Sequence, residues 1–539
     1  MSQTFAADDL PNRTTTAPTG GTDLSLAAAR ALLAAVLVAA VGLRLGLFAG
    51  YGASDDGQYA RLAHEMVQGK FDYRTSPITQ VFALRIGLLL PVMAAYAAAG
   101  VNEAAMLAYP MTISLAGVVL AYAFGARLFS RRAGVLAAAL WAVLPIDAHS
   151  ATMLVPDGPA ALWMGAGVYA LYRAVHSGAG AWPRAGLGLL AGLLLGLSWL
   201  HKESVTFLVP FLGLYALVLV LRDRRHFWPL AAMALGGAVV LGTEFLYYHW
   251  QTGDALWRVH QVEQNQAAVF RFGPHALNRL ADGLSYRPEQ LRDRLLVSGP
   301  QALLLDPWHG LLPLAGLLVA LWAAIRRDGR LAFPAAWTGC LLLVFNFAPC
   351  SLKTYLPLPI LTRYPYPVLL PAALAVAGFA DARLAGRWGG WLRRRFALLL
   401  CGLLAVALAG TLLAGQMLER RGKRPRCPAA RAVAARLAPQ DVLYTDWRNR
   451  GAIQFFLGFR RDGDIRGLSQ IQDAQPQTPS LVLLDRDMAF LYSRPEAAFE
   501  GWYQGKTPPN WKLVWSGWRA KLYRVEAAAR STKPTTTGP

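Results

Sequence analysis

Residues 104–132 read AAMLAYPMTISLAGVVLAYAFGARLFSRR, an apolar run that ends in Arg131 and Arg132. An apolar helix needs about 20 residues to cross the roughly 30 Å of hydrocarbon in a membrane. The run meets that length, and basic residues in short loops mark the cytoplasmic side of a span. This stretch therefore predicts a transmembrane helix whose C-terminal end faces the cytoplasm.

The whole chain has the composition of a membrane protein. It has 539 residues, of which 55% are hydrophobic and only 16% are charged, whereas soluble proteins have about 25% charged residues. The net charge of +21 comes from short basic clusters between apolar runs, which favours contact with anionic lipid over nucleic-acid binding. Three of the four cysteines lie inside apolar stretches, which excludes a disulfide scaffold. None of the four has the spacing of metal ligands.

Twelve apolar stretches reach or approach the length of a transmembrane helix. They are approximately 25–48, 82–100, 104–128, 134–151, 159–175, 185–200, 204–221, 228–248, 309–325, 331–350, 366–382 and 396–416. From residue 104 onward, a basic cluster follows every second stretch, which places five loops in the cytoplasm. The loops between them then face outside, and they begin near Asp147, His201, His249 and Lys353.

The stretch at 82–100 decides the side on which the first polar loop lies. If it spanned the membrane, loop 49–78 would lie opposite the other outer loops. Arg85 in its first turn, Pro91 in its middle and its marginal length favour a helix that lies along the membrane surface or re-enters. We therefore expect eleven spans and an inside N-terminus; the alternative is an ordinary span with the N-terminus outside.

The expected fold is an all-α polytopic membrane domain of about eleven spans plus interfacial helices, followed by a small soluble α/β domain. Its divisions are a disordered tail at 1–24, the membrane domain at 25–416, an extracytoplasmic domain at 417–527 and a disordered tail at 528–539. In the soluble domain the patterns predict strands at 441–446 and 480–485, helices at 428–437 and 486–499, and a hairpin from 511–515 to 520–525.

Acids gather in the first two outer loops. Asp55 and Asp56 stand where a helix is expected to begin, and Tyr59 lies on the apolar face of that helix. Asp157 follows a proline in the second loop. Each acid has an alternative role as a helix cap. Charged side chains at the ends of membrane spans cost free energy and often mark functional sites. We therefore favour a catalytic role for these carboxylates.

Cations accompany the acids. His201, Lys202 and Glu203 interrupt two apolar helices, and Lys202 is either neutralised by Glu203 or available to a phosphate. Arg363 precedes the span at 366–382. With Arg85, these cations would let one pocket bind a diffuse anion, which indicates transfer of a polar group from an anionic donor. The long outer loop also carries scattered possible metal ligands without a two-histidine metal spacing: His249, His260, Glu263, His275 and His309.

At these residues the sequence resembles the GT-C glycosyltransferases that use polyprenyl-phosphate sugars, and the nearest branch is that of protein O-mannosyltransferases and the lipid A aminoarabinose transferase. The resemblance covers roughly residues 25–380. It rests on Asp-Asp-x-x-Tyr at 55–59, GARLFSRRAG at 125–134, Pro145 with Pro156-Asp157, Thr252-Gly253-Asp254, and Arg363-Tyr364-Pro365. The family's usual first pair is Asp-Glu, and this chain has Asp55-Asp56, which leaves Asp55 in the first-acid position.

The resemblance implies an integral membrane glycosyltransferase with its active site on the outer face of the inner (plasma) membrane. The first acid of the pair is the family's catalytic base, so Asp55 is expected to deprotonate a hydroxyl acceptor with inversion at the sugar. We expect Asp157 to orient the acceptor or sugar. We expect donor-phosphate binding by Lys202, Arg85, Arg363 and Tyr364, and acceptor binding or support by Asp56, Tyr59, His201 and Glu203.

The expected partners are a polyprenyl-phosphate sugar donor, a lipid, glycan or protein acceptor, and membrane lipid, with no nucleic acid. No cofactor is certain, and the need for a divalent metal stays open. The rival interpretation is a lipid-linked sugar flippase or transporter, in which intramembrane charges line a permeation path. Transporters typically show internal repeats and helices broken at the midplane. Here the charges lie at helix ends, which favours the enzyme.

Overall fold

A computed structural model describes residues 23–526 of the chain, with gaps. The gaps are 49, 53–54, 74–79, 273–287, 350–354, 356, 359, 386–408, 411–425, 469–470, 472–478, 486–500, 503, 505 and 518–519. The expected tail at 528–539, the expected helix at 486–499, and nearly all of the expected tail at 1–24 and of the expected span at 396–416 therefore lie outside the described residues. The total of eleven spans stays a prediction.

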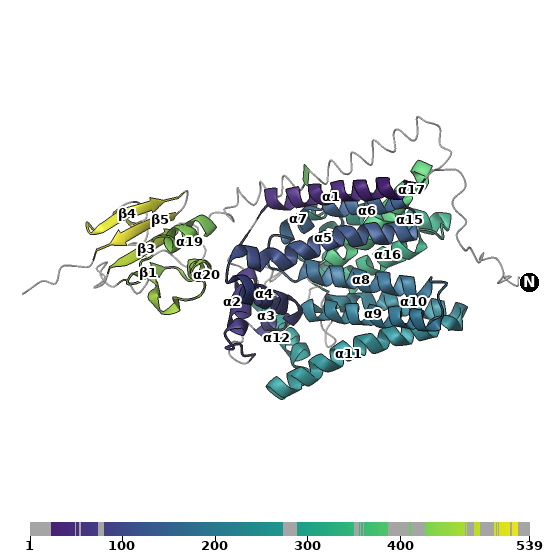
Figure 1. The fold of residues 1–539 in the computed structure, drawn as a ribbon, viewed down its shortest axis with the longest axis horizontal. Coiled ribbons are helices and arrows are strands. Elements are labelled where there is room, and N and C mark those ends of the chain that lie inside the picture. The colour runs from purple at the N-terminus through teal and green to yellow at the C-terminus, as the bar shows by residue number, and fades with distance from the viewer. Residues whose placement is uncertain are drawn as a thin grey trace, which may run out of the picture.

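The described membrane domain is a bundle of long apolar helices, as the sequence predicts. Its long helices are α1 (Leu26–Gly46), α5 (Glu103–Leu128), α6 (Arg131–Ala142), α8 (Asp157–Val175), α9 (Ala181–His201), α10 (Val209–Arg222), α11 (Phe227–Thr252), α15 (Leu312–Arg326), α16 (Ala332–Phe347) and α17 (Tyr366–Ala385). Among the described residues, six helices are long and apolar enough to cross a membrane. Figure 1 shows the long helices running side by side.

Polar caps and prolines set where these helices begin. The side chains of Ser25, Asn102 and Ser130 each accept a hydrogen bond from one backbone N–H in the first turn of α1, α5 and α6. These N–H groups would otherwise lack partners within the helix. The expected single span at 134–151 is wrong. The chain instead ends α6 at Ala142 and starts the short helix α7 (Pro145–Ser150), with Pro145 at the first helical position, where its missing N–H costs no hydrogen bond.

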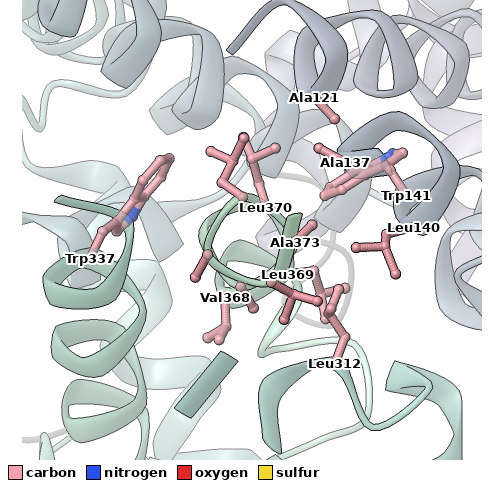
Figure 2. Packing of buried hydrophobic residues seen from close by; sticks show 14 of the residues in the cluster. Ala121, Ala137, Leu140, Trp141, Leu312, Trp337, Val368, Leu369, Leu370 and Ala373 are labelled. Carbon is pink, nitrogen blue, oxygen red and sulfur yellow. The ribbon is translucent and has the colours of Figure 1, made fainter. Parts of the chain in front are cut away.

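Helix α17 lies at the centre of the bundle. Figure 2 shows Val368, Leu369, Leu370 and Ala373 pointing from α17 toward different neighbours, which include Trp141 of α6, Leu312 of α15 and Trp337 of α16. Of the six candidate spans among the described residues, α17 is the most deeply buried, with 78% of its apolar window inside the protein. The loop that enters α17, residues 361–365, is therefore fixed in position by the most buried helix of the domain.

The short helices gather at one end of the bundle, which we call the site end (Figure 1). They include α2 (Asp55–Val67), α3 (Gln80–Ala83), α4 (Ile86–Ala99) and α12 (Trp257–Phe272). At 1.5 Å per residue, the 14 residues of α4 extend about 21 Å, too short to cross the hydrocarbon core. Helix α10 also has 14 residues, so length alone does not set α4 apart, and the position of 82–100 along the membrane surface stays a prediction.

The remaining described helical turns connect these elements. They are η1 (Glu203–Leu208), η2 (Arg224–His226), α13 (Pro288–Asp293), η3 (Arg294–Ser298), α14 (Gly299–Leu304) and η4 (Pro307–His309). The basic loops meet at the opposite end of the bundle, as the alternation of basic clusters predicts, and three of their arginines make contacts there. These contacts are Arg132 Nε to Asp381 Oδ1 (3.2 Å), Arg184 Nη2 to His226 Nδ1 (3.0 Å) and Arg127 Nη2 to His176 O (3.5 Å).

The C-terminal domain is built on a five-stranded sheet. Its described elements are α19 (Arg426–Ala434), β1 (Val442–Thr445), α20 (Trp447–Phe456), η5 (Asp462–Asp464), β2 (Ile465–Gly467), β3 (Ser480–Asp485), β4 (Trp511–Ser516) and β5 (Ala520–Val525). The strand order is β2-β1-β3-β5-β4, with β1 parallel to β2 and β3, and β5 antiparallel to β3 and β4. The predicted strands and closing hairpin are confirmed. Strand β2 and helix α20 were not predicted.

Candidate active site

Four separate chain segments bring the predicted acids and cations to the site end. Asp55 is the first residue of α2, and Asp157 is the first residue of α8. Lys202 is the extended residue that separates α9 from η1, and Arg363 lies just before α17. Because helices that alternate in direction return every second loop to the same end, residues far apart in sequence meet there.

These side chains form one network in which acidic and basic groups alternate. The Arg363 Nη2 atom donates to Asp55 Oδ2 at 2.5 Å, and its Nε lies 3.7 Å from Asp157 Oδ2. The Lys202 ammonium donates to Asp157 Oδ1 and lies 4.1 Å from the centre of the Tyr364 ring. The structure thus brings together five of the residues that we expected at the site, and it pairs the cations with the acids.

The network runs from an open edge to a buried interior. The side chains of Asp55 and Arg363 are 32% and 35% exposed, whereas those of Asp157 and Lys202 are 3% and 13% exposed. The Oδ2 atom of Asp157 is buried and has no hydrogen-bond partner among the described residues. A buried carboxylate oxygen that accepts no hydrogen bond lowers the stability of the fold. This atom is therefore suited to accept a hydrogen bond from a ligand hydroxyl.

Arg85 and Glu203 form a second ion pair next to this network. The guanidinium of Arg85 makes two hydrogen bonds to the Glu203 carboxylate, one of them 3.0 Å from Nη2 to Oε1. Lys202 and Glu203 therefore have different partners and do not neutralise each other. The Nε of Arg85 is buried and is without a hydrogen-bond partner in the described part of the chain, so one N–H remains for an anion.

Tyr59 lies between the two ion-pair networks. Burial raises the pKa of its hydroxyl well above the ordinary value, and the charges of Arg85, Asp55, Arg363 and Asp157 also act on it. Its ring is 4% exposed and packs edge-on against Phe82 at 5.1 Å. The hydroxyl consequently stays protonated and is able to donate a hydrogen bond at the centre of the site.

Two of the predicted residues make contacts of a structural kind. Asp56 is fully buried, and its carboxylate accepts the backbone N–H of Gly52. The His201 Nδ1 lies 2.7 Å from the Leu197 carbonyl oxygen, so Nδ1 carries the proton and Nε2 accepts from the Tyr109 hydroxyl at 2.7 Å. His201 thus uses both ring nitrogens in the packing between α5 and α9.

A buried polar network below the site was not predicted. Asp147 accepts hydrogen bonds from Arg44, Ser114 and Tyr366, and all four residues are at most 4% exposed. The network joins α1, α5, α7 and α17, and Tyr366 follows Arg363 by three positions. An arginine inside an apolar span is a signal that the sequence provides, but its partner cannot be read from the sequence.

A second network that was not predicted supports the segment before α4. Arg258 of α12 pairs with Glu244 of α11 and donates to the backbone oxygens of Trp199 (3.1 Å) and Leu84 (2.5 Å). Because Leu84 directly precedes Arg85, this network holds the backbone from which the site arginine projects. Glu244 stands inside an apolar run of the sequence, which is the signal that marks it.

The scattered histidines do not form a metal cluster in the described part of the chain. The His260 Nδ1 lies 2.7 Å from Asp254 Oδ2 at an exposed position. The His309 Nε2 donates to the carbonyl oxygen of Thr362 at 2.6 Å and so steadies the residue before Arg363. His275 lies outside the described residues, and the need for a metal stays open.

Comparison with known proteins places this architecture in a class. A model of the family described as dolichyl-phosphate-mannose-protein mannosyltransferase matches residues 89–244. No curated protein matches the sequence. Among solved structures, ArnT from Cupriavidus metallidurans bound to undecaprenyl phosphate aligns with a TM-score of 0.54 and 16% identity, covering 93% of this chain and 98% of that chain.

A second similar structure is the archaeal oligosaccharyltransferase AglB from Archaeoglobus fulgidus in complex with an inhibitory peptide and a dolichol-phosphate. Its TM-score is 0.53 at 14% identity, and the alignment covers 94% of this chain and 75% of that chain. The chain is therefore a polytopic membrane protein with the GT-C fold. The matching family model agrees with the resemblance seen in the sequence over residues 89–244.

Proposed function

We propose that this protein is a membrane glycosyltransferase that moves a sugar from a polyprenyl-phosphate carrier to a hydroxyl-bearing acceptor. One observation carries the proposal: acids and cations from four loops converge at one end of a GT-C bundle, where Arg363 pairs with Asp55 and lies 3.7 Å from Asp157, and Lys202 pairs with Asp157. Ionisable groups that converge on one place in a membrane protein mark a functional site more often than a structural one.

The cations of the site would hold the donor phosphate. Arg363 and Lys202 both contact Asp157, and the buried Nε of Arg85 has no hydrogen-bond partner among the described residues. A phosphodiester carries one negative charge, and the departing polyprenyl phosphate carries more as the bond to the sugar breaks. Cations fixed at that point stabilise the developing charge and so lower the barrier.

Asp55 would act as the general base. Its carboxylate takes the proton from the acceptor hydroxyl while the acceptor oxygen bonds to the anomeric carbon. The bond from that carbon to the phosphate oxygen breaks, the electron pair leaves with polyprenyl phosphate, and the sugar inverts. General-base help of this kind contributes roughly 10²–10⁴-fold.

The ion pair between Arg363 and Asp55 suggests an order of binding. The Asp55 Oδ2 atom that accepts from Arg363 at 2.5 Å is occupied and is not free to accept a second hydrogen bond from the acceptor hydroxyl in the same direction. A donor phosphate that draws Arg363 toward itself would release Asp55 for the acceptor. We therefore propose that the donor binds before the acceptor is activated.

Asp157 would orient the substrates. Its Oδ1 is held by Lys202, and its buried Oδ2, 3.7 Å from Arg363 Nε, accepts no hydrogen bond in the described chain, so a sugar or acceptor hydroxyl could donate to it. We further propose that the site end, loop 49–78 and the C-terminal domain face the periplasmic or other extracytoplasmic side of the plasma membrane. The basic loops at the opposite end support this orientation.

The test is an assay of the purified protein in liposomes with a panel of polyprenyl-phosphate sugars and hydroxyl acceptors. The proposal predicts a glycosylated acceptor and free polyprenyl phosphate in equal amounts. The flippase alternative predicts movement of the intact donor across the bilayer with no bond cleavage. Donor movement without product in every pairing would contradict the transferase.

A further inference from the structure

The C-terminal domain packs directly on α2, the helix that begins with Asp55. One hydrophobic cluster runs without a break from the short helices of the site end into the core of the sheet domain, and Figure 1 shows α20 next to α2. The cluster includes Tyr59 and Leu62 of α2, and Phe455 of α20. The two domains therefore share a core at the position of the proposed base.

Tyr51 is the centre of this contact. Its ring is 2% exposed and stacks on Phe455 with centroids 4.3 Å apart and planes inclined by 17°. Its hydroxyl donates to the carbonyl oxygen of Gly451 in α20 at 3.1 Å. Phe455 and Gly451 lie on one face of α20 at a spacing of four residues, so the tyrosine is held by both its ring and its hydroxyl.

The same tyrosine contacts the first turn of α2. A Cβ added to Gly57 would lie only 2.6 Å from the Tyr51 hydroxyl oxygen, so this turn packs against that hydroxyl as closely as glycine allows. Gly57 and Asp55 belong to the same helical turn. A shift of Tyr51 would therefore move the backbone from which Asp55 projects.

An ion pair and a backbone contact hold Tyr51 from its other side. The Glu103 carboxylate accepts the backbone N–H of Tyr51 at 3.1 Å and pairs with the Arg431 guanidinium of α19. That guanidinium in turn lies 5.1 Å from the centre of the Phe456 ring. The first residue of α5 thus links the start of the site loop to the C-terminal domain.

We propose that Tyr51 is a positioning residue through which the C-terminal domain holds α2, and with it Asp55, in the geometry needed for transfer. This inference rests on the proposed function of Asp55 as base. The donor-binding cations Arg363 and Lys202 project from other elements, the loop before α17 and the end of α9. Loosening Tyr51 should therefore slow transfer while leaving donor affinity unchanged.

The test compares Tyr51→Ala, Phe455→Ala, their double variant and Tyr51→Phe, with Leu513→Ala at an exposed position of β4 as control. Misplacement of a catalytic group by about 1 Å costs on the order of 100-fold, so each alanine variant should lower kcat by roughly 10- to 100-fold. Donor Kd should stay within about twofold. The double variant should be no slower than the slower single one, and Tyr51→Phe, which keeps the stack, should recover part of the rate.

Hydrogen exchange of residues 55–67 provides a readout that needs no turnover. Exchange should be faster in Tyr51→Ala and Phe455→Ala, and unchanged in the Leu513→Ala control. Normal kcat in both alanine variants, additive losses, or equal losses of kcat and donor affinity would overturn the positioning role. If the wild-type protein transfers no sugar, the proposed function fails; unchanged exchange of 55–67 would then also reject the holding of α2 by Tyr51.

Discussion

Arg363 offers the clearest separation of donor binding from folding. The Asp55–Arg363 pair has both side chains about one-third exposed (32% and 35%), and exposed ion pairs contribute roughly 0–1 kcal/mol to stability. A charge-assisted hydrogen bond to a phosphate contributes about 1.5–3 kcal/mol. Arg363 also lies 3.7 Å from the buried Asp157, but Lys202 still pairs with that carboxylate when Arg363 is removed. Arg363→Ala should therefore change the free energy of unfolding by only about 1 kcal/mol while raising the donor Kd by roughly 10- to 150-fold.

The measurement is isothermal titration of a polyprenyl-phosphate sugar into the detergent-solubilised protein, with thermal unfolding of the same samples. Arg225→Ala is the matched control, because Arg225 also pairs with an aspartate, Asp223, but in a loop at the opposite end of the bundle. The control should keep the wild-type Kd. A donor Kd within twofold of wild type in Arg363→Ala would mean that the phosphate binds elsewhere, and equal weakening in both variants would reduce the effect to net charge.

The buried pair of Arg44 and Asp147 predicts a large loss of stability, about 3–5 kcal/mol, for Arg44→Met in thermal unfolding, and little loss for Arg30→Met on the exposed face of the same helix. Topology is checked with an impermeant thiol reagent on Gln68→Cys in a chain without its native cysteines; labelling of intact cells is expected, and labelling only after permeabilisation would refute the outer-face site. Burial lowers the pKa of His64, so the unfolded chain binds more protons than the folded chain as pH falls below about 6.5. Thermal stability should drop in that window, and the drop should shrink in His64→Gln; an identical pH profile would contradict this.

The helices were predictable because their apolar length is a local property of the sequence. The expected stretch at 104–128 agrees with α5 (Glu103–Leu128) almost residue for residue. The convergence of Asp157 and Lys202 was also predictable, since alternating basic loops from residue 104 onward place the remaining loops at the other end. Asp55 joins them only under the further prediction that 82–100 does not span the membrane. The break between α6 and α7 shows the limit of this method. Hydropathy is high across Leu144 and Pro145 and predicts one continuous helix, but the backbone leaves the helical conformation between Ala142 and Pro145.

The partner of each charge was not predictable. Lys202 and Glu203 are neighbours in sequence, yet the extended backbone at Lys202 (φ −160°, ψ 143°) accompanies pairing of the lysine with Asp157 and of the glutamate with Arg85. The contact between Tyr51 and Gly451 joins residues 400 positions apart. Such contacts depend on tertiary packing, and no periodicity in the sequence encodes them.

The central claim, that Asp55 is the general base of a sugar transfer, is tested most directly by the transfer rate of Asp55→Asn at saturating donor and acceptor. The substitution keeps the shape of the side chain and removes its basicity, so the rate should fall by roughly 100-fold or more while donor affinity is unchanged or improved. Asp56→Asn is the matched control, because the Asp56 carboxylate is buried against the backbone of Gly52. A rate close to wild type in Asp55→Asn, or an equal and mild loss in both variants, would contradict the account and favour helix capping.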